Sequence, residues 1–106
     1  SIVISSPRLY RVERSVLVNQ LSELAHMGIE VLIITAASST LTEYLLQRGI
    51  SVRIAPGVAL RTTIIDKAIV WYGAVNALGY TTEEDNVIKV VDAKLANELF
   101  EILLAL

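Results

Sequence analysis

A five-residue pattern occurs twice in the first half of the chain. Met27-Gly28-Ile29-Glu30-Val31 resembles Arg48-Gly49-Ile50-Ser51-Val52, and in each copy a glycine comes shortly before an apolar run. A glycine at this place is typical of a left-handed cap at the end of a helix, and the apolar run after it predicts a buried strand. Two such units in series predict right-handed βαβ crossovers and therefore neighbouring parallel strands.

The segments around this repeat complete a predicted α/β fold. We expect buried strands at 2–4, 31–35 and 52–55, with helices over about 9–27 and 40–48 between them. Thr40 and Glu43 have the spacing of a capping box, which predicts the start of the second helix. Asp66-Lys67 lies between the strand-like runs 62–65 and 68–72 and predicts a β-hairpin. A strand at 87–91 and a final helix capped by Asp92 complete a mixed sheet with two βαβ units, a hairpin and a C-terminal helix.

Length and hydrophobicity indicate one domain that meets a partner. The 106 residues fit a single domain over 1–106. Apolar residues make up 54% of the chain, which is more than an ordinary soluble domain carries. We therefore expect some apolar surface to be covered by a partner. The chain starts without Met and stops inside the apolar run 99–106, so we expect it to be a piece of a longer protein.

Charge and cysteine content restrict the function classes. The net charge of −2 lacks the basic balance of strong non-specific DNA binders, so only a local basic patch could contact a nucleic-acid backbone. The absence of cysteine excludes disulfides and thiolate metal sites and suits the cytoplasm. No apolar run is long enough to span a bilayer, and the acidic run 83–85 lacks the spaced ligands of a calcium loop. We expect a cytoplasmic chain without a metal, a cofactor or a membrane partner.

The segment 64–76 carries the most specific motif. Asp66 is followed by a strand-like run and then by Gly73, Ala74 and Asn76. This arrangement resembles the second part of the HKD motif of phospholipase D-like proteins, where His-x-Lys and four further residues precede an Asp, a strand and a Gly-Ser-x-Asn turn. The upstream order of segments also fits that family, so the resemblance covers nearly the whole chain and implies a phospholipase D-like half.

Three positions depart from the family's motif. Ala59, Arg61 and Ala74 stand where the family has His, Lys and Ser. In the family, one histidine attacks phosphorus and a second, from the other half of a pseudo-dimer, protonates the leaving group, because imidazole titrates near neutral pH. Alanine can do neither, and a guanidinium does not act as a nucleophile. The resemblance therefore implies a degenerate domain in which we assign no catalytic residue.

A phosphate-binding site can remain where the catalytic residues are lost. Arg61 can hold a phosphate through two parallel, charge-assisted hydrogen bonds, while Asn76 and backbone amides near Gly73 can add further hydrogen-bond donors. Asp66 is expected to be a structural residue of the motif. In the alternative interpretation, Asp66 and Asn76 only stabilise the hairpin and its following turn, as Asp and Asn commonly do.

Other residues are candidates for nucleic-acid binding, and each of them also has a purely structural interpretation. Trp71 and Tyr72 could form a stacking platform for a base, or fill the core, which we favour for at least one of them. His26, the only histidine, is expected to be structural. Three arginines near the start of the first helix could contact nucleic acid or form a solvated face: Arg8, Arg11 and Arg14.

The resemblance also implies a biological setting. Similar modules are appended to prokaryotic helicases, ATPases and restriction-type proteins, so we expect a non-catalytic module that binds nucleic-acid phosphate or mediates assembly. Because the family's fold has two halves around a near two-fold axis, we expect a homodimer or pairing with a second half of the parent chain. Two alternatives stay open: a phosphodiesterase or nuclease half-site completed by another subunit or segment, and a doubly wound domain that binds a small ligand at Ser5, Ser6, Thr35 and Ala36.

Overall fold

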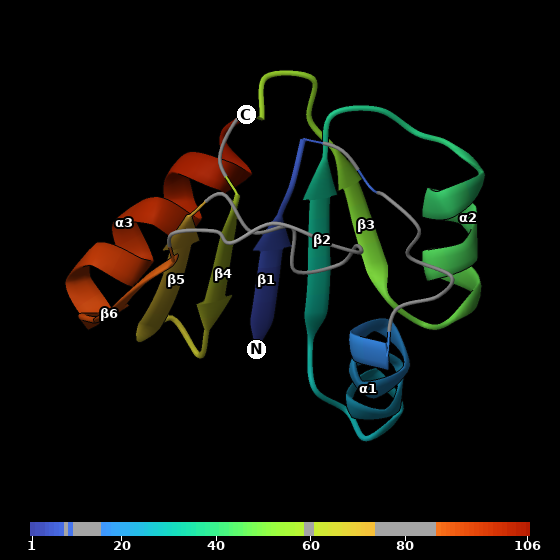
Figure 1. The fold of residues 1–106 in the computed structure, drawn as a ribbon, viewed down its shortest axis with the longest axis horizontal. Helices are drawn as coiled ribbons and strands as arrows, with labels where there is room; N and C mark the ends of the chain where they lie inside the picture. Colours follow the sequence, from blue (N-terminus) through green and yellow to red (C-terminus); the bar gives the residue numbers. More distant parts are fainter. Residues whose placement is uncertain (8, 10–15, 59–60, 74–86) are drawn as a thin grey trace.

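A six-stranded mixed sheet forms the centre of the computed structural model, which describes residues 1–7, 9, 16–58, 61–73 and 87–106 (Figure 1). The strand order is β3-β2-β1-β4-β5-β6. The strands β1, β2 and β3 are parallel to one another, whereas the pairs β1–β4, β4–β5 and β5–β6 are antiparallel. This confirms the predicted α/β class, the two βαβ units and the hairpin. The strands are β1 (Ile2–Ser5), β2 (Val31–Thr35), β3 (Ser51–Ile54), β4 (Thr62–Ile65), β5 (Ile69–Gly73) and β6 (Val87–Val91).

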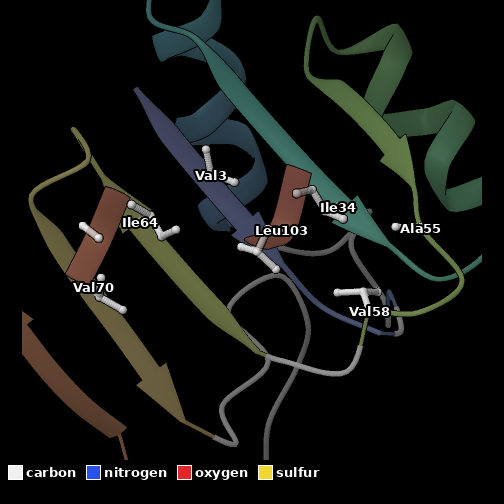
Figure 2. Packing of buried hydrophobic residues seen from close by; sticks show 8 residues of the cluster. Val3, Ile34, Ala55, Val58, Ile64, Val70 and Leu103 are labelled. Atoms are coloured by element: carbon white, nitrogen blue, oxygen red, sulfur yellow. The ribbon is translucent and has the colours of Figure 1, made fainter. Parts of the chain in front are cut away.

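The helices lie on opposite faces of the sheet. On one face, α1 (Val16–His26) and α2 (Thr40–Gln47) pack against β1–β3 around buried residues that include Ile4 and Ile33. On the other face, α3 (Ala93–Leu104) covers a second cluster. Figure 2 shows this second cluster, in which Leu103 of α3 lies near Val3 and Ile34, and which also includes Ile64 and Val70. Alternation along β1 and β2 therefore supplies apolar residues to both clusters.

The two repeated glycines end α1 and α2 in the same way. Gly28 and Gly49 have φ angles of 94° and 84°, which a side chain would make costly. After each glycine, the next backbone N–H donates to a carbonyl of the last helical turn, from Ile29 to Leu24 and from Ile50 to Leu45, at 3.1 Å in both cases. These are the bonds of a Schellman cap, so the predicted glycine caps are confirmed.

The start of α2 differs from the prediction by one residue. Ser39, and not Thr40, is the cap: its hydroxyl accepts from the N–H of Leu41 at 3.2 Å. Its own N–H donates to the hydroxyl of Thr42 at 2.9 Å, so Glu43 has no part in the capping box. The physical reason is that Ser39 is the last residue with extended backbone, at φ −159°, and a hydroxyl can replace the expected carboxylate as acceptor.

The hairpin and the last helix begin as predicted. Asp66 and Lys67 both have φ 53°, the combination found in type I′ turns, and the N–H of Ala68 donates to the carbonyl of Ile65 at 3.0 Å. Asp92 caps α3, and its carboxylate accepts from the second and third backbone N–H groups after it. Within the described ranges, no helix has both the length and the apolar character needed to cross a bilayer.

Candidate phosphate site at the carboxyl edge of the parallel strands

The sheet extends to both sides of β1, whose carboxyl end therefore lies where the strand order reverses. The parallel strands β2 and β3 extend the sheet to one side of β1, while β4–β6 extend it to the other. Open α/β sheets bind ligands where the strand order reverses in this way, beyond the carboxyl ends of the strands. The register pairs Ser5, the last residue of β1, with Thr62, the first residue of β4. We call this end of the sheet the carboxyl edge.

Two of the predicted phosphate ligands meet at the carboxyl edge. The register pairs Thr62 with Tyr72. Because the two strands are antiparallel, Arg61, which precedes Thr62, lies opposite Gly73, which follows Tyr72. Arg61 is exposed, and its guanidinium is the cation that the sequence predicts for this site. Gly73 has no side chain, which lets a ligand approach the backbone closely. The fold therefore brings the guanidinium-bearing residue next to a glycine on the adjacent strand.

Buried hydroxyls lie beneath this edge. Ser5, Ser6, Thr35 and Thr62 are all buried, and each stands at or next to the carboxyl-edge end of its strand. The Thr35 hydroxyl donates to the carbonyl of Pro7 at 3.4 Å. Among the described residues, the hydroxyl of Thr62 has no hydrogen-bond partner, although Thr62 is only 3% exposed. No sequence motif marks Thr62, because its position beside Ser5 follows from the pairing of β4 with β1.

Asp66 and His26 lie at the opposite edge of the sheet. Asp66 is at the far end of β4 from Arg61, where its carboxylate accepts from the Ser1 amino group at 2.6 Å. His26 ends α1 just before β2 begins, and its Nδ1 lies 2.7 Å from the carbonyl oxygen of Ser22. The only imidazole in the sequence is therefore not beside Arg61.

Other predicted residues fall outside the described part of the chain. These are the three arginines and the amide of the predicted sites, together with the two alanines of the motif: Arg8, Arg11, Arg14, Asn76, Ala59 and Ala74. The acidic run 83–85 lies outside it as well. Among the residues that the structure describes, no group of three or more His, Asp or Glu is placed to hold a metal ion.

Trp71 is not the core member of the aromatic pair. Its side chain is 40% exposed on β5, and the Lys89 Nζ lies 5.3 Å from the centroid of its ring. The reason is that Trp71 points to the face carrying α1 and α2, which pack over β1–β3 and not over β5. The side chain of Tyr72 is outside the described part of the structure.

Known structures share this fold. No family profile and no curated protein matches the sequence. The structure is similar to Nuc, a phospholipase D family member from Salmonella typhimurium, with a TM-score of 0.74 and 17% identity over 98% of this chain and 75% of that chain. It is similar to polyphosphate kinase from Porphyromonas gingivalis, with a TM-score of 0.70 and 21% identity over 96% of this chain and 21% of that chain.

A DNA-binding protein is also among the similar structures. TrmBL2, an archaeal chromatin protein with a novel mode of DNA binding, has a TM-score of 0.61 and 15% identity over 96% of this chain and 41% of that chain. At these identities the likeness concerns the fold. The chain is therefore a domain with a phospholipase D-like α/β fold, as the motif around Asp66 predicted.

Proposed function

We propose that this chain is a non-catalytic phospholipase D-like module that binds nucleic-acid phosphate at the carboxyl edge. The observation that carries the proposal is the meeting of Arg61 and Gly73 at the point where the strand order reverses. A guanidinium recognises two phosphate oxygens at once, and a glycine beside it adds a backbone N–H without a side chain. The DNA-binding description of TrmBL2, a protein of similar fold, supports nucleic acid as the source of that phosphate.

The non-catalytic part of the proposal follows from the side chains at this edge. Phosphodiester cleavage of the phospholipase D type needs a nucleophile that can become bonded to phosphorus. The sequence has Ala59 at the motif's histidine position, and His26 lies at the other edge of the sheet. Arg61 can bind the phosphate and stabilise its charge, but a guanidinium does not attack phosphorus.

Salt-dependent binding tests the phosphate site. A fluorescein-labelled abasic oligodeoxyribose phosphate presents backbone without bases, and its affinity should fall as salt rises because counterions are released. Arg61→Gln should weaken binding and lower the slope of log K against log salt by about 1. Lys67→Asn removes a cation in the hairpin turn at the opposite edge and is the matched control, expected to bind like the unchanged chain.

A hydrolysis assay tests the absence of catalysis. 4-Nitrophenolate should be released from bis(4-nitrophenyl) phosphate no faster with the protein than without it. Turnover above background that disappears in Arg61→Ala would overturn the non-catalytic proposal and favour an active half-site. Binding that is insensitive to salt would overturn the phosphate site itself.

We further propose that two copies pair through the outer face of α3. Leu95 and Ile102 are seven residues apart on this face and are 40% and 56% exposed, and Leu106 continues the stripe. Lys94 and Glu101 are also seven residues apart beside it. In an antiparallel, two-fold pairing of α3 with its copy, each Lys94 comes close to the partner's Glu101, and the apolar stripe is covered. A second half in a longer parent chain could use the same face.

The setting that we propose is a larger nucleic-acid-processing protein of the helicase or ATPase type, working in the cytoplasm. The chain corresponds to 41% of TrmBL2 and 21% of the polyphosphate kinase, so similar domains occur inside longer proteins. The full-length gene product tests this directly. A motor domain beside residues 1–106 would support the setting, and a flanking segment with an intact HKD motif would contradict the non-catalytic assignment.

A further inference from the structure

A row of paired residues runs across one face of the sheet. Ile4 of β1 is paired with Thr63 of β4, Thr63 with Trp71 of β5, and Trp71 with Lys89 of β6. Residues paired in this way point to the same face of a sheet. Ile4 is buried beneath the helices, whereas Trp71 and Lys89 at the other end of the row are exposed. The row therefore leaves the core and emerges on an open surface.

None of the described helices covers this end of the face. The helices α1 and α2 contribute to the cluster around Ile4 and Ile33, and α3 packs on the opposite face against Ile64 and Val70. Thr63 is partly exposed, and Trp71 and Lys89 are exposed; we call these three residues the Trp71 platform. The platform continues toward the carboxyl edge, because Arg61 precedes Thr63 by two residues.

The charged residues that the structure describes beside the platform are cations. Lys89 is the only charged residue in β4, β5 and β6, and Arg61 stands just beyond the start of β4. Trp71, on the strand between β4 and β6, thus lies between two cations in a chain whose net charge is −2. An aromatic ring on an open sheet, with cations beside it, matches the alternation of base and phosphate in a single-stranded nucleic acid.

We infer that the Trp71 platform binds single-stranded nucleic acid, with one base stacked on the indole and phosphates held by Lys89 and Arg61. This inference rests on the proposed phosphate site and extends it from the carboxyl edge onto the sheet. The ammonium of Lys89 lies over the Trp71 ring, so a base must displace it. An exposed cation–π contact is worth about a 2- to 5-fold change in an equilibrium, and base stacking about a 5- to 150-fold change. Base stacking on Trp71 is therefore stronger than the cation–π contact that it replaces, and the displaced Lys89 ammonium binds a phosphate.

Trp71 is the only tryptophan, so its fluorescence reports directly on the platform. Titration with the oligonucleotide dT12 at low salt should quench the emission to a saturating value, whereas an abasic oligomer of the same length should leave it unchanged. Anisotropy of labelled dT12 should show an affinity about 5- to 150-fold weaker in Trp71→Ala. Lys89→Gln should lower the salt slope by about 1. Affinity for the abasic oligomer should change less than twofold in Trp71→Ala.

Further variants keep the result interpretable. Trp71→Leu preserves apolar volume without a π-face and should lose affinity like Trp71→Ala, whereas Trp71→Phe should retain most of it. Val91→Ala alters the same face at its far end and should have no effect on dT12 binding.

If dT12 and the abasic oligomer bind equally and only Arg61→Gln weakens their binding, the platform is refuted while the phosphate site stands. If neither oligomer binds, both proposals fail. A blue shift of Trp71 emission on raising protein concentration alone would show that a second copy covers the face, and would refute the inference.

Discussion

Thr62 carries a buried hydroxyl that lowers the stability of the fold. Its hydroxyl is buried and has no hydrogen-bond partner among the described residues. A buried polar group without a partner costs about 1–3 kcal/mol of folding free energy. Thr42 is equally buried, but its hydroxyl donates to the Ser39 carbonyl at 2.7 Å and accepts from the Ser39 N–H at 2.9 Å. The two threonines therefore differ in hydrogen bonding and not in burial.

Replacing each of these threonines with valine should shift stability in opposite directions. Thr62→Val removes an unused hydroxyl and should raise the free energy of unfolding by about 1 kcal/mol. Thr42→Val removes a hydroxyl that makes two hydrogen bonds and should lower it by about 1–3 kcal/mol. Urea denaturation of both variants measures the difference. A loss of stability in Thr62→Val would mean that its hydroxyl has a partner that the fold needs.

The contacts of His26 fit the structural role expected for it. Its Nδ1 contacts the Ser22 carbonyl, and the Ser22 hydroxyl donates to the carbonyl of Arg48 at 2.7 Å, which ties the end of α1 to the end of α2. Arg48 in turn donates to the side chain of Asn19 and lies over the ring of Tyr44. These groups join two helix ends far from the carboxyl edge.

At the scale of elements, local signals in the sequence were enough to find the repeat and the turns. Gly28 and Gly49 mark helix ends because few other residues accept a positive φ, and Asp66-Lys67 marks a turn for a related reason. The predicted cap of α2 is one residue too late, because Ser39 and Thr40 are both good capping residues and only the backbone geometry decides between them.

A pair of substitutions tests that assignment at the start of α2. Ser39→Ala removes the acceptor for the Leu41 N–H and should destabilise the protein by about 1 kcal/mol. Thr40→Ala changes an exposed residue within the first turn and should alter stability by less than about 0.5 kcal/mol. Thermal unfolding followed by circular dichroism provides the comparison. The reverse order of effects would restore Thr40 as the cap.

The candidate site was only partly predictable, because its residues meet through strand pairing. The motif spacing identified Arg61 and Gly73, and a two-residue turn between the strands brings their positions together. The partner of Trp71 is different: Lys89 is 18 positions away and meets it only through the β5–β6 register. Register between distant strands depends on which faces are buried in the complete fold, so a local pattern does not reveal it.

For the whole molecule, burial is unequal on the two sides of α3. Leu103 is completely buried in the cluster of Figure 2, whereas Ile102, its neighbour in sequence, is on the outer face. An apolar stripe beside Lys94 and Glu101 is suited to a copy of itself, since a two-fold axis pairs each cation with an anion. A stable pairing of this kind must bury roughly 1,000 Å² or more, so neighbouring parts of the sheet edge must contribute as well.

Sedimentation equilibrium over a range of concentrations tests this pairing. The unchanged chain should sediment as a dimer, and Ile102→Glu should shift it to a monomer, because burying an added carboxylate in the apolar part of the interface costs several kcal/mol. Leu46→Glu is the matched control, since Leu46 is similarly exposed, at 54%, but lies on α2. It should leave the dimer intact. A chain that stays monomeric at every concentration, or a dimer that survives Ile102→Glu, would refute pairing through α3, and the stripe would then need a different partner.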